Sequence, residues 1–174
     1  MLFVPQIATA DLYQLDSGNT QVSLYLHRFG ITWVTVHFSD ISGALVLSSQ
    51  SSSSTVEVGV ATASVHSNWP GWSERLRSAD WLDAARYPRL SFHAEHLEIG
   101  ATQVAATGEL TLHGVTRPIM FEVSFVGCRA ASVCRFVARG QARRSEFGLP
   151  HEFWTGGDAV EFAISGAALA TPPK

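Results

Sequence analysis

Apolar and polar residues alternate along most of this chain, in short segments that are separated by clusters of Gly, Pro, Ser and Asn. Because successive side chains of a β-strand point to opposite faces, each alternating segment predicts a strand with one buried face. Strands that follow one another without intervening helices are typical of a β-sandwich or β-barrel and not of a βα repeat. The predicted strands lie near residues 11–16, 20–28, 32–38, 41–48, 55–65, 89–98, 102–113, 116–126, 133–145 and 159–169.

One segment has a helical pattern instead. Residues 72–88, WSERLRSADWLDAARYP, end at a proline, which cannot continue a helix. Ser78 or Asp80 can cap a second short turn. We therefore expect a helical insertion near residues 72–86, in one or two pieces, that lies across an end or a side of the barrel. The apolar side chains that can share its buried face are Leu76, Trp81, Leu82 and Ala85.

Length and composition fit one domain. The chain has 174 residues, of which 46% are hydrophobic and 16% charged, and its formal net charge is -3. These values argue against disorder and against a nucleic-acid partner, which would need a basic surface. No apolar run approaches the roughly 18–20 residues of a membrane-spanning helix. We assign residues 11–170 to a single domain and residues 171–174 to a C-terminal tail.

The first ten residues, MLFVPQIATA, allow two interpretations. The letters ATA before Asp11 have the small-x-small form of a cleavage site, so residues 1–10 fit the remnant of a trimmed signal peptide. They fit equally well a short apolar extension that packs on the barrel.

The two cysteines bear on the cellular compartment. Cys128 and Cys134 flank RAASV, a predicted hairpin connection, and paired strands can bring two such side chains within disulfide distance. A disulfide there favours an oxidising location. The alternative is that both are small buried thiols.

In three predicted strands the side chains on one face become smaller along the strand. Small residues follow one another on the faces that carry Ala138 and Gly140, Ala106 and Gly108, and Gly166 and Ala168. If the small residues of these strands lie at the same level of a barrel, they would leave an apolar tunnel inside it. The alternative is that bulky side chains on facing strands, such as Trp33, Phe92 or Trp154, fill the space. The residues expected to line the apolar pore and to contact a ligand there are Val56, Val58, Val60, Phe92, Ala106, Gly108, Leu110, Phe121, Val123, Phe136, Ala138, Gly140, Phe162 and Ile164.

Arg144 ends the thin face of its strand. An arginine at an inward position needs a carboxylate, carbonyl groups or a ligand head group as partner. We favour a salt bridge with Asp83 or Glu146 that closes the barrel end; the alternative is contact with a ligand head group. The outward residues expected to be solvated are Arg135, Arg139 and Arg143.

The sequence shows neither a readable catalytic centre nor a metal site. In HAEH, His93 and His96 are three residues apart on a strand and are expected on opposite faces, so they cannot share one ion. Neither a Gly-x-Ser-x-Gly motif nor a nucleophile with a nearby base can be recognised. Glu109 and Glu122 fall on outward faces, where a solvated charge is the ordinary role. We expect no catalytic residue, no metal and no cofactor.

The order of local motifs across nearly the whole chain resembles the YceI-like family of polyisoprenoid-binding proteins. The matching stretches are YQLD at 13–16, FSDISGAL at 38–45, ERLRSADWLDAARYPRLSF at 74–92, GELTLHGVTRPIMFEV at 108–123 and ARRSEFGL at 142–149. The resemblance implies an all-β fold, an antiparallel lipocalin-like β-barrel of about eight main strands around a hydrophobic pore.

The resemblance also implies a function. A non-enzymatic protein would bind, transport or sequester a long-chain isoprenoid, a quinone or a fatty-acid-like lipid. Family members occur as exported and as cytoplasmic proteins, and the cysteine pair is similar to that of exported members, so a periplasmic or secreted location is expected. The alternative function is a filled barrel that acts as a protein-interaction or stress-response module. The sequence leaves open whether the barrel forms a homodimer.

Two departures from the family pattern concern the polar end of the pocket. Many relatives have a histidine near the end of the second strand where this chain has Arg28, with His27 one place earlier. Val36 and His37 replace the glycine and arginine that often precede the next phenylalanine. We assign Arg28, together with Arg144, to this polar end.

Overall fold

The computed structural model describes residues 10–28, 32–48, 54–99, 103–129, 133–151 and 157–171. The expectations for residues 1–9, for Trp154 and for residues 172–174 therefore lie outside the described residues. Within the described ranges, no helix is both long and apolar enough to cross a membrane.

The alternating segments form strands close to the predicted boundaries. The strands in the described ranges are β1 (Ala10–Leu15), β2 (Gln21–Arg28), β3 (Thr32–Phe38), β4 (Ile41–Ser48), β5 (Thr55–Ala61), β6 (Val65–Ser67), β7 (Arg89–Ile99), β8 (Val104–Leu112), β9 (Val115–Arg129), β10 (Val133–Arg143) and β11 (Ala159–Ala170). Inward residues on these strands are apolar and outward ones are mostly polar, which is the pattern that predicted them.

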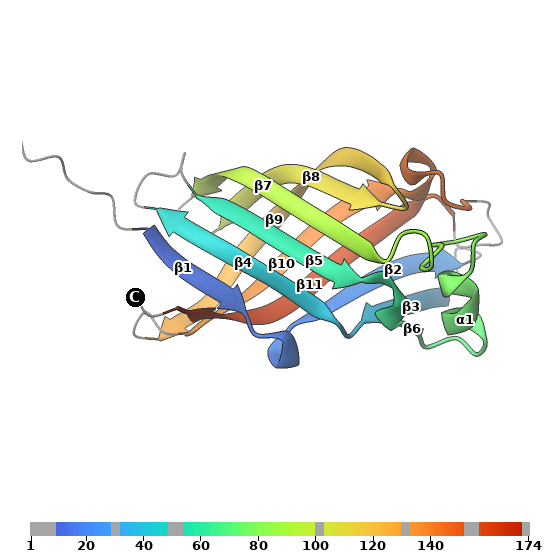
Figure 1. Cartoon of the computed structure of the whole chain (residues 1–174), viewed down its shortest axis with the longest axis horizontal. Coiled ribbons are helices and arrows are strands. Elements are labelled where there is room, and N and C mark those ends of the chain that lie inside the picture. The colour runs from blue at the N-terminus through green and yellow to red at the C-terminus, as the bar shows by residue number, and fades with distance from the viewer. Residues whose placement is uncertain are drawn as a thin grey trace, which may run out of the picture.

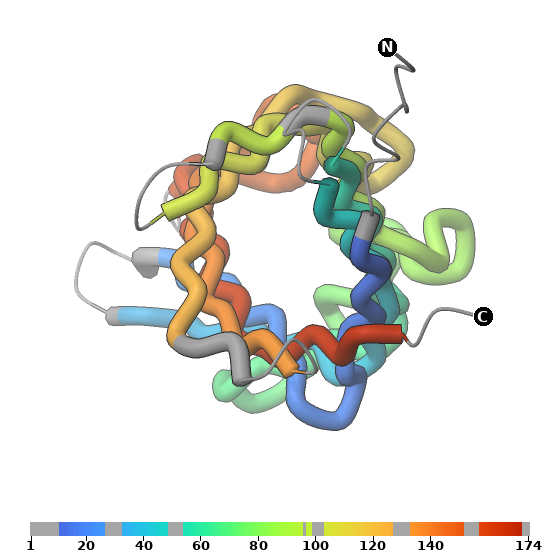
Figure 2. The backbone as a smooth tube through the Cα atoms, turned by 90° about the vertical axis from the view of Figure 1, so that its left-hand side faces the viewer, coloured from blue at the N-terminus to red at the C-terminus, as the bar shows by residue number. Residues whose placement is uncertain are grey.

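Eight of the described strands close into a ring. Its order is β1-β4-β5-β7-β8-β9-β10-β11, and β11 pairs back onto β1. Every neighbouring pair in the ring is antiparallel. Figure 1 shows the tilted strands from the side, and Figure 2 shows the ring from one end. The predicted antiparallel barrel is confirmed.

The edge of β11 is shared by two strands. Residues 168–170 of β11 pair with β1, and residues 161–165 pair with β2. The chain is interrupted between β1 and β2 by the 3-10 turn η1 (Ser17–Asn19), which Asp16 caps by accepting hydrogen bonds from the Gly18 N–H (3.1 Å) and from Asn19 Nδ2 (2.7 Å). Beyond this break β2, β3 and β6 extend the sheet on one side of the barrel only.

One end of the barrel is filled and covered, and we call it the filled end. There α1 (Trp72–Arg77) packs against β6, and the 3-10 turn η4 (Arg144–Phe147) lies after β10 (Figure 1). The short helix is confirmed, but it ends where the Ser78 hydroxyl donates to the Arg75 carbonyl (2.6 Å), and turns follow. Ala85 therefore lies exposed, away from the predicted helical face. The buried side chains at this end include Val34, Phe38, Val65, Leu76, Trp81, Leu82, Phe147 and Leu149.

Candidate functional site: an apolar cavity inside the ring

A cavity of about 80 Å³ lies inside the eight-stranded ring. Each strand of the ring contributes at least one apolar side chain to its wall, and Thr20 is the polar residue among the described ones around it. The wall residues are Leu15, Thr20, Ile41, Ala44, Leu45, Val56, Val58, Phe92, Leu97, Val104, Ala106, Phe121, Val123, Phe125, Phe136, Ala138 and Ile164. The site can therefore offer contact to apolar groups and, at one point, to a polar one.

Three phenylalanines form the floor of the cavity toward the filled end. The rings of Phe92 and Phe121 meet edge to face with their centroids 4.9 Å apart, and those of Phe121 and Phe162 do so at 5.8 Å. Edge-to-face contacts of this kind stabilise aromatic clusters beyond the area they bury. Phe92 and Phe121 line the cavity, whereas Phe162 lies behind them.

The opposite end of the barrel, where β1 begins and β11 ends, is the mouth end (Figure 1). Tyr13, Cys134 and Ala168 form a small buried cluster there. The cavity-wall residues that also pack on this cluster are Leu15, Leu45, Phe125 and Phe136. The cavity thus extends between the phenylalanine floor and the mouth-end cluster.

Many residues that the thin-face pattern predicted for the pore do lie around this cavity. They are Val56, Val58, Phe92, Ala106, Phe121, Val123, Phe136, Ala138 and Ile164. Ligand contact at these positions stays a prediction. The sequence pattern missed the wall residues of β1 and β4, among them Leu15 and Leu45, because their strand faces carry bulky side chains and no run of small residues.

The other predicted pore residues are not among those that line this cavity, and ligand contact at these positions stays a prediction. Val60, Leu110 and Phe162 are buried toward the filled end. The space left by the two glycines is taken by neighbouring atoms. A Cβ at Gly108 would collide with the carbonyl oxygen of His93, and a Cβ at Gly140 would come within 2.8 Å of the Phe121 ring.

Thr20 was also missed: it begins the predicted strand 20–28, but the structure places it between η1 and β2. Its side chain folds over Gly166 of β11: a Cβ at Gly166 would come within 2.6 Å of Thr20 Oγ1. Thr20 is 6% exposed, and Oγ1 has no hydrogen-bond partner among the described residues. The sequence signal that points here is the glycine on the thin face of the last strand.

Arg144 lies at the filled end and not around the cavity. It is 4% exposed, and its guanidinium carbon is 5.7 Å from the centroid of the Trp81 ring. A desolvated cation over an indole face is a favourable contact. The salt bridge with Asp83 or Glu146 stays a prediction. Arg28 ends β2, and its side chain lies outside the described part of the chain.

Asp158 holds the turn that positions Arg144. Its carboxylate accepts hydrogen bonds from the Ser145 N–H (2.8 Å) and hydroxyl (2.9 Å), and its carbonyl accepts from the Arg144 N–H (2.9 Å). Burial alone would raise the pKa of Asp158, but these Ser145 hydrogen bonds and the charges of His151 and Arg143 lower the pKa below its ordinary value. The carboxylate therefore stabilises the fold above its unfolded pKa, and this contribution is lost as the pH falls through the folded pKa.

The register places Cys128 of β9 directly opposite Cys134 of β10. Residues opposite one another on antiparallel strands have Cα atoms about 4.5–5.5 Å apart, within the range of disulfides. Cys134 is buried. Because the side chain of Cys128 lies outside the described part, the bond itself stays a prediction.

The histidine pair on β7 lies at an irregularity in the strand pairing. A bulge in the pairing of β7 with β8 sets His93 opposite Glu109 and His96 opposite Thr107, two residues that share one face of β8. The bulge departs from the regular strand that the prediction of opposite faces assumed. Because the side chain of His96 lies outside the described part of the chain, the prediction itself is not tested. Among the described residues, however, no group of three His, Cys, Asp or Glu residues could hold a metal.

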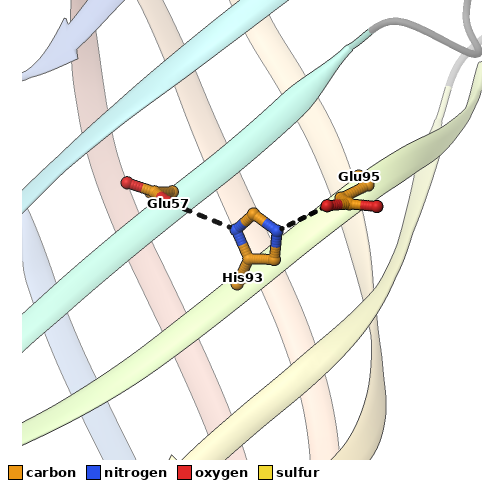
Figure 3. A network of polar contacts seen from close by, with 3 residues as sticks. All are labelled: Glu57, His93 and Glu95. Atoms are coloured by element: carbon orange, nitrogen blue, oxygen red, sulfur yellow. Dashed lines mark hydrogen bonds and ion pairs between the residues drawn. The ribbon is translucent and has the colours of Figure 1, made fainter.

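His93 takes part in a polar network on the outer surface (Figure 3). Its Nδ1 lies 3.4 Å from Glu57 Oε1, and its Nε2 lies 3.3 Å from Glu95 Oε1. All three side chains are substantially exposed, so these contacts contribute little to stability. Both ring nitrogens face carboxylates, and the network resembles a solvated surface cluster.

A larger hollow of about 1030 Å³ is an open groove on the outside of the sheet. It runs over β9, β10 and β11 to the β2–β3 hairpin, and Glu122, Arg139 and Glu161 lie along it. Arg135, Arg139 and Arg143 are all exposed, as predicted. A groove that carries charges of both signs and opens to solvent suits an apolar ligand less well than the inner cavity does.

Comparison with known proteins agrees with the eight-stranded barrel. The family described as a YceI-like domain matches residues 13–168, which include six strands of the ring completely and most of β11 and part of β1. The chain belongs to the YceI-like family. Protein YceI of Escherichia coli O157:H7 is 26% identical over 172 residues, 95% of this chain and 90% of that protein. Protein YceI of Salmonella arizonae is 27% identical with the same coverage.

Solved structures show the same YceI-like fold. Burkholderia cenocepacia BcnA superposes with a TM-score of 0.77 at 18% identity and covers 88% of this chain and 98% of its own. A polyisoprenoid-binding domain from Saccharophagus degradans, implicated in plant cell wall breakdown, has a TM-score of 0.67 at 14% identity and covers 91% and 98%. At these identities the likeness establishes the fold alone.

Proposed function

We propose that this YceI-like barrel binds a long apolar lipid of the isoprenoid or quinone type and carries or sequesters it without catalysis. The observation that carries the proposal is a cavity wall built by eight strands from apolar side chains and one threonine. The solved relative that is described as polyisoprenoid-binding, with the same fold, supports this ligand class.

Apolar contact alone can supply the affinity. Each methylene removed from water contributes about 0.8 kcal/mol, and a polyprenyl tail offers many of them. The cavity volume of about 80 Å³ is smaller than the volume that three water molecules occupy in the liquid, at roughly 30 Å³ each. A long tail therefore requires the leucine and phenylalanine side chains of the wall to change rotamer and move apart.

The test is native mass spectrometry of protein purified from cells, followed by organic extraction. We expect a bound species whose mass is released into the organic phase and identifies a long-chain lipid. The second candidate, a filled barrel that acts as a protein-interaction or stress-response module, predicts apoprotein only. Delipidated protein that also fails to take up an added prenol would overturn the proposal.

Filling the cavity by one side chain should block binding. Ala106 faces the cavity, and leucine there would occupy space that a ligand needs, at a cost of about 1–3 kcal/mol of folding free energy from overpacking. We expect Ala106→Leu to lower affinity for added prenol about tenfold or more, equivalent to about 1.4 kcal/mol. Ala105→Leu, the adjacent residue on the outer face, is the matched control. Equal binding by both variants would contradict the placement of the ligand.

We further propose that Cys128 and Cys134 form a disulfide in a periplasmic or secreted protein, because the register sets them opposite one another. The bond closes a short loop, so the chain-entropy model gives it about 2 kcal/mol of stabilisation. Intact mass after alkylation without reductant should show neither thiol modified, and the same protein reduced first should show both. Two alkylated thiols in the unreduced exported protein would rule the bond out.

A further inference from the structure

We propose that the Thr20 hydroxyl is the polar contact point of the cavity and that it hydrogen-bonds a neutral oxygen carried by the head of an otherwise apolar ligand. The inference rests on the proposed function, because it assigns the ligand's head to one place in the same cavity. The chemical class it selects is a lipid with an alcohol or carbonyl oxygen, in preference to a pure hydrocarbon or a prenyl phosphate.

The position of Thr20 is fixed from two sides. The Asp16-capped turn η1 ends immediately before it, and Gly166 leaves the space into which its side chain folds. A Cβ at Gly166 would also come within 3.1 Å of Phe136 Cζ, so Thr20 and Phe136 share this part of the wall. The hydroxyl is held at one level of the barrel by its surroundings.

That level is set by the inward residues of β11. From the floor outward they are Phe162, Ile164, Gly166 and Ala168. Phe162 belongs to the phenylalanine floor, Ile164 lines the cavity, and Ala168 lies in the mouth-end cluster. Thr20, which covers Gly166, therefore lies in the part of the cavity wall nearest the mouth, and a ligand with its oxygen here would point its tail toward the floor.

The buried hydroxyl of Thr20 favours a ligand that carries an oxygen atom. A threonine hydroxyl can donate one hydrogen bond and accept others, and Oγ1 makes none of them with the described residues while 94% of the residue's surface is buried. A buried polar atom without a partner costs free energy that a ligand acceptor can recover. A hydrocarbon placed beside it recovers nothing.

The charge of the wall determines the kind of oxygen. Among the described residues around the cavity there is no Lys, Arg or His to neutralise an anion. A phosphate or carboxylate at the Thr20 level would be desolvated without a countercharge, which is far more costly than desolvation of a neutral alcohol or carbonyl. The geometry thus favours a neutral head group.

The experiment uses delipidated wild-type protein, Thr20→Val and Thr20→Ser, with a long polyprenol, a hydrocarbon of similar length such as squalene, and a polyprenyl phosphate as probes. Valine keeps the shape of threonine without the hydroxyl, and serine keeps the hydroxyl. We expect Thr20→Val to lose about three- to tenfold in affinity for the polyprenol and nothing for the hydrocarbon. Thr20→Ser should keep the wild-type preference for the prenol.

Melting temperatures provide an independent readout. Without ligand, Thr20→Val should melt at the wild-type temperature or a few degrees higher, about 2–4 °C, because a buried unpaired hydroxyl has been removed. Thr20→Ala replaces it in the binding assays if the valine variant does not fold. Equal prenol affinity of wild type and Thr20→Val, or tighter binding of the phosphate than of the prenol by wild type, would overturn the inference and leave the proposed function standing. Wild-type protein that binds none of the probes would overturn both.

Discussion

Alanine in place of Gly108 is expected to destabilise the barrel by about 3 kcal/mol, the upper part of the range for overpacked cores. The added Cβ would collide with the carbonyl oxygen of His93 and come within 2.8 Å of the Ala94 Cβ. Those atoms belong to the β7 bulge, where the pairing with β8 shifts register between His93 and His96. Backbone on a paired strand cannot rotate away as a flexible side chain can, so the two strands would have to separate locally.

Thermal unfolding measures this effect. For a chain of this size the loss corresponds to a melting temperature about 6–12 °C lower. Gly18→Ala is the matched control, because its Cβ would meet only Asp16 Oδ1 at an ordinary 3.5 Å. That variant should stay within about 0.5 kcal/mol of wild type. If both alanine variants melted together, Gly108 would not be a position of obligatory close approach.

Removal of the Arg144 side chain should have a comparable effect, about 3 kcal/mol, through the lost cation–π contact and the hole that a large buried side chain leaves. Arg144 is 4% exposed and its guanidinium lies over the Trp81 ring. Because it is not part of the cavity wall, the loss should appear in delipidated protein and remain the same when prenol is added.

The measurement compares Arg144→Ala with Arg143→Ala, its exposed neighbour, in thermal melts with and without prenol. Arg143→Ala should change the free energy of unfolding by no more than about 0.5 kcal/mol. Arg144→Lys should recover only part of the loss, since an ammonium lacks the planar face that stacks on an indole. An unchanged melting temperature of delipidated Arg144→Ala, with weaker prenol binding, would instead place Arg144 in contact with the ligand.

The alternation of residues was enough to predict the strands, because burial of one sheet face imposes a period of two directly on the sequence. It was also enough to place Ala106 and Ala138 on the inside of the barrel. Closure of the ring between β1 and β11 joins residues from the two ends of the chain, which no local pattern encodes.

The thin-face positions that do not line the cavity have one physical cause in common. A small residue on an inner face creates space, but its neighbours decide whether that space stays open. At Gly108 the backbone of a bulged strand occupies it, at Gly140 the ring of Phe121, and at Gly166 the side chain of Thr20. Between His93 and His96 a bulge interrupts the regular alternation that the prediction for this pair assumed.

The switch from β1 to β2 along one edge of β11 separates two parts of the molecule that have different roles. On one side of η1, β1 completes the wall around the cavity; on the other, β2 and β3 belong to the filled end. The Asp16 N–H donates a backbone hydrogen bond to the Ala167 carbonyl (2.9 Å), which holds the segment between β1 and β2 against β11. Ligand binding and stability therefore depend on largely separate sets of residues. The cavity wall can change in sequence to fit a different ligand without loss of the packing at the filled end.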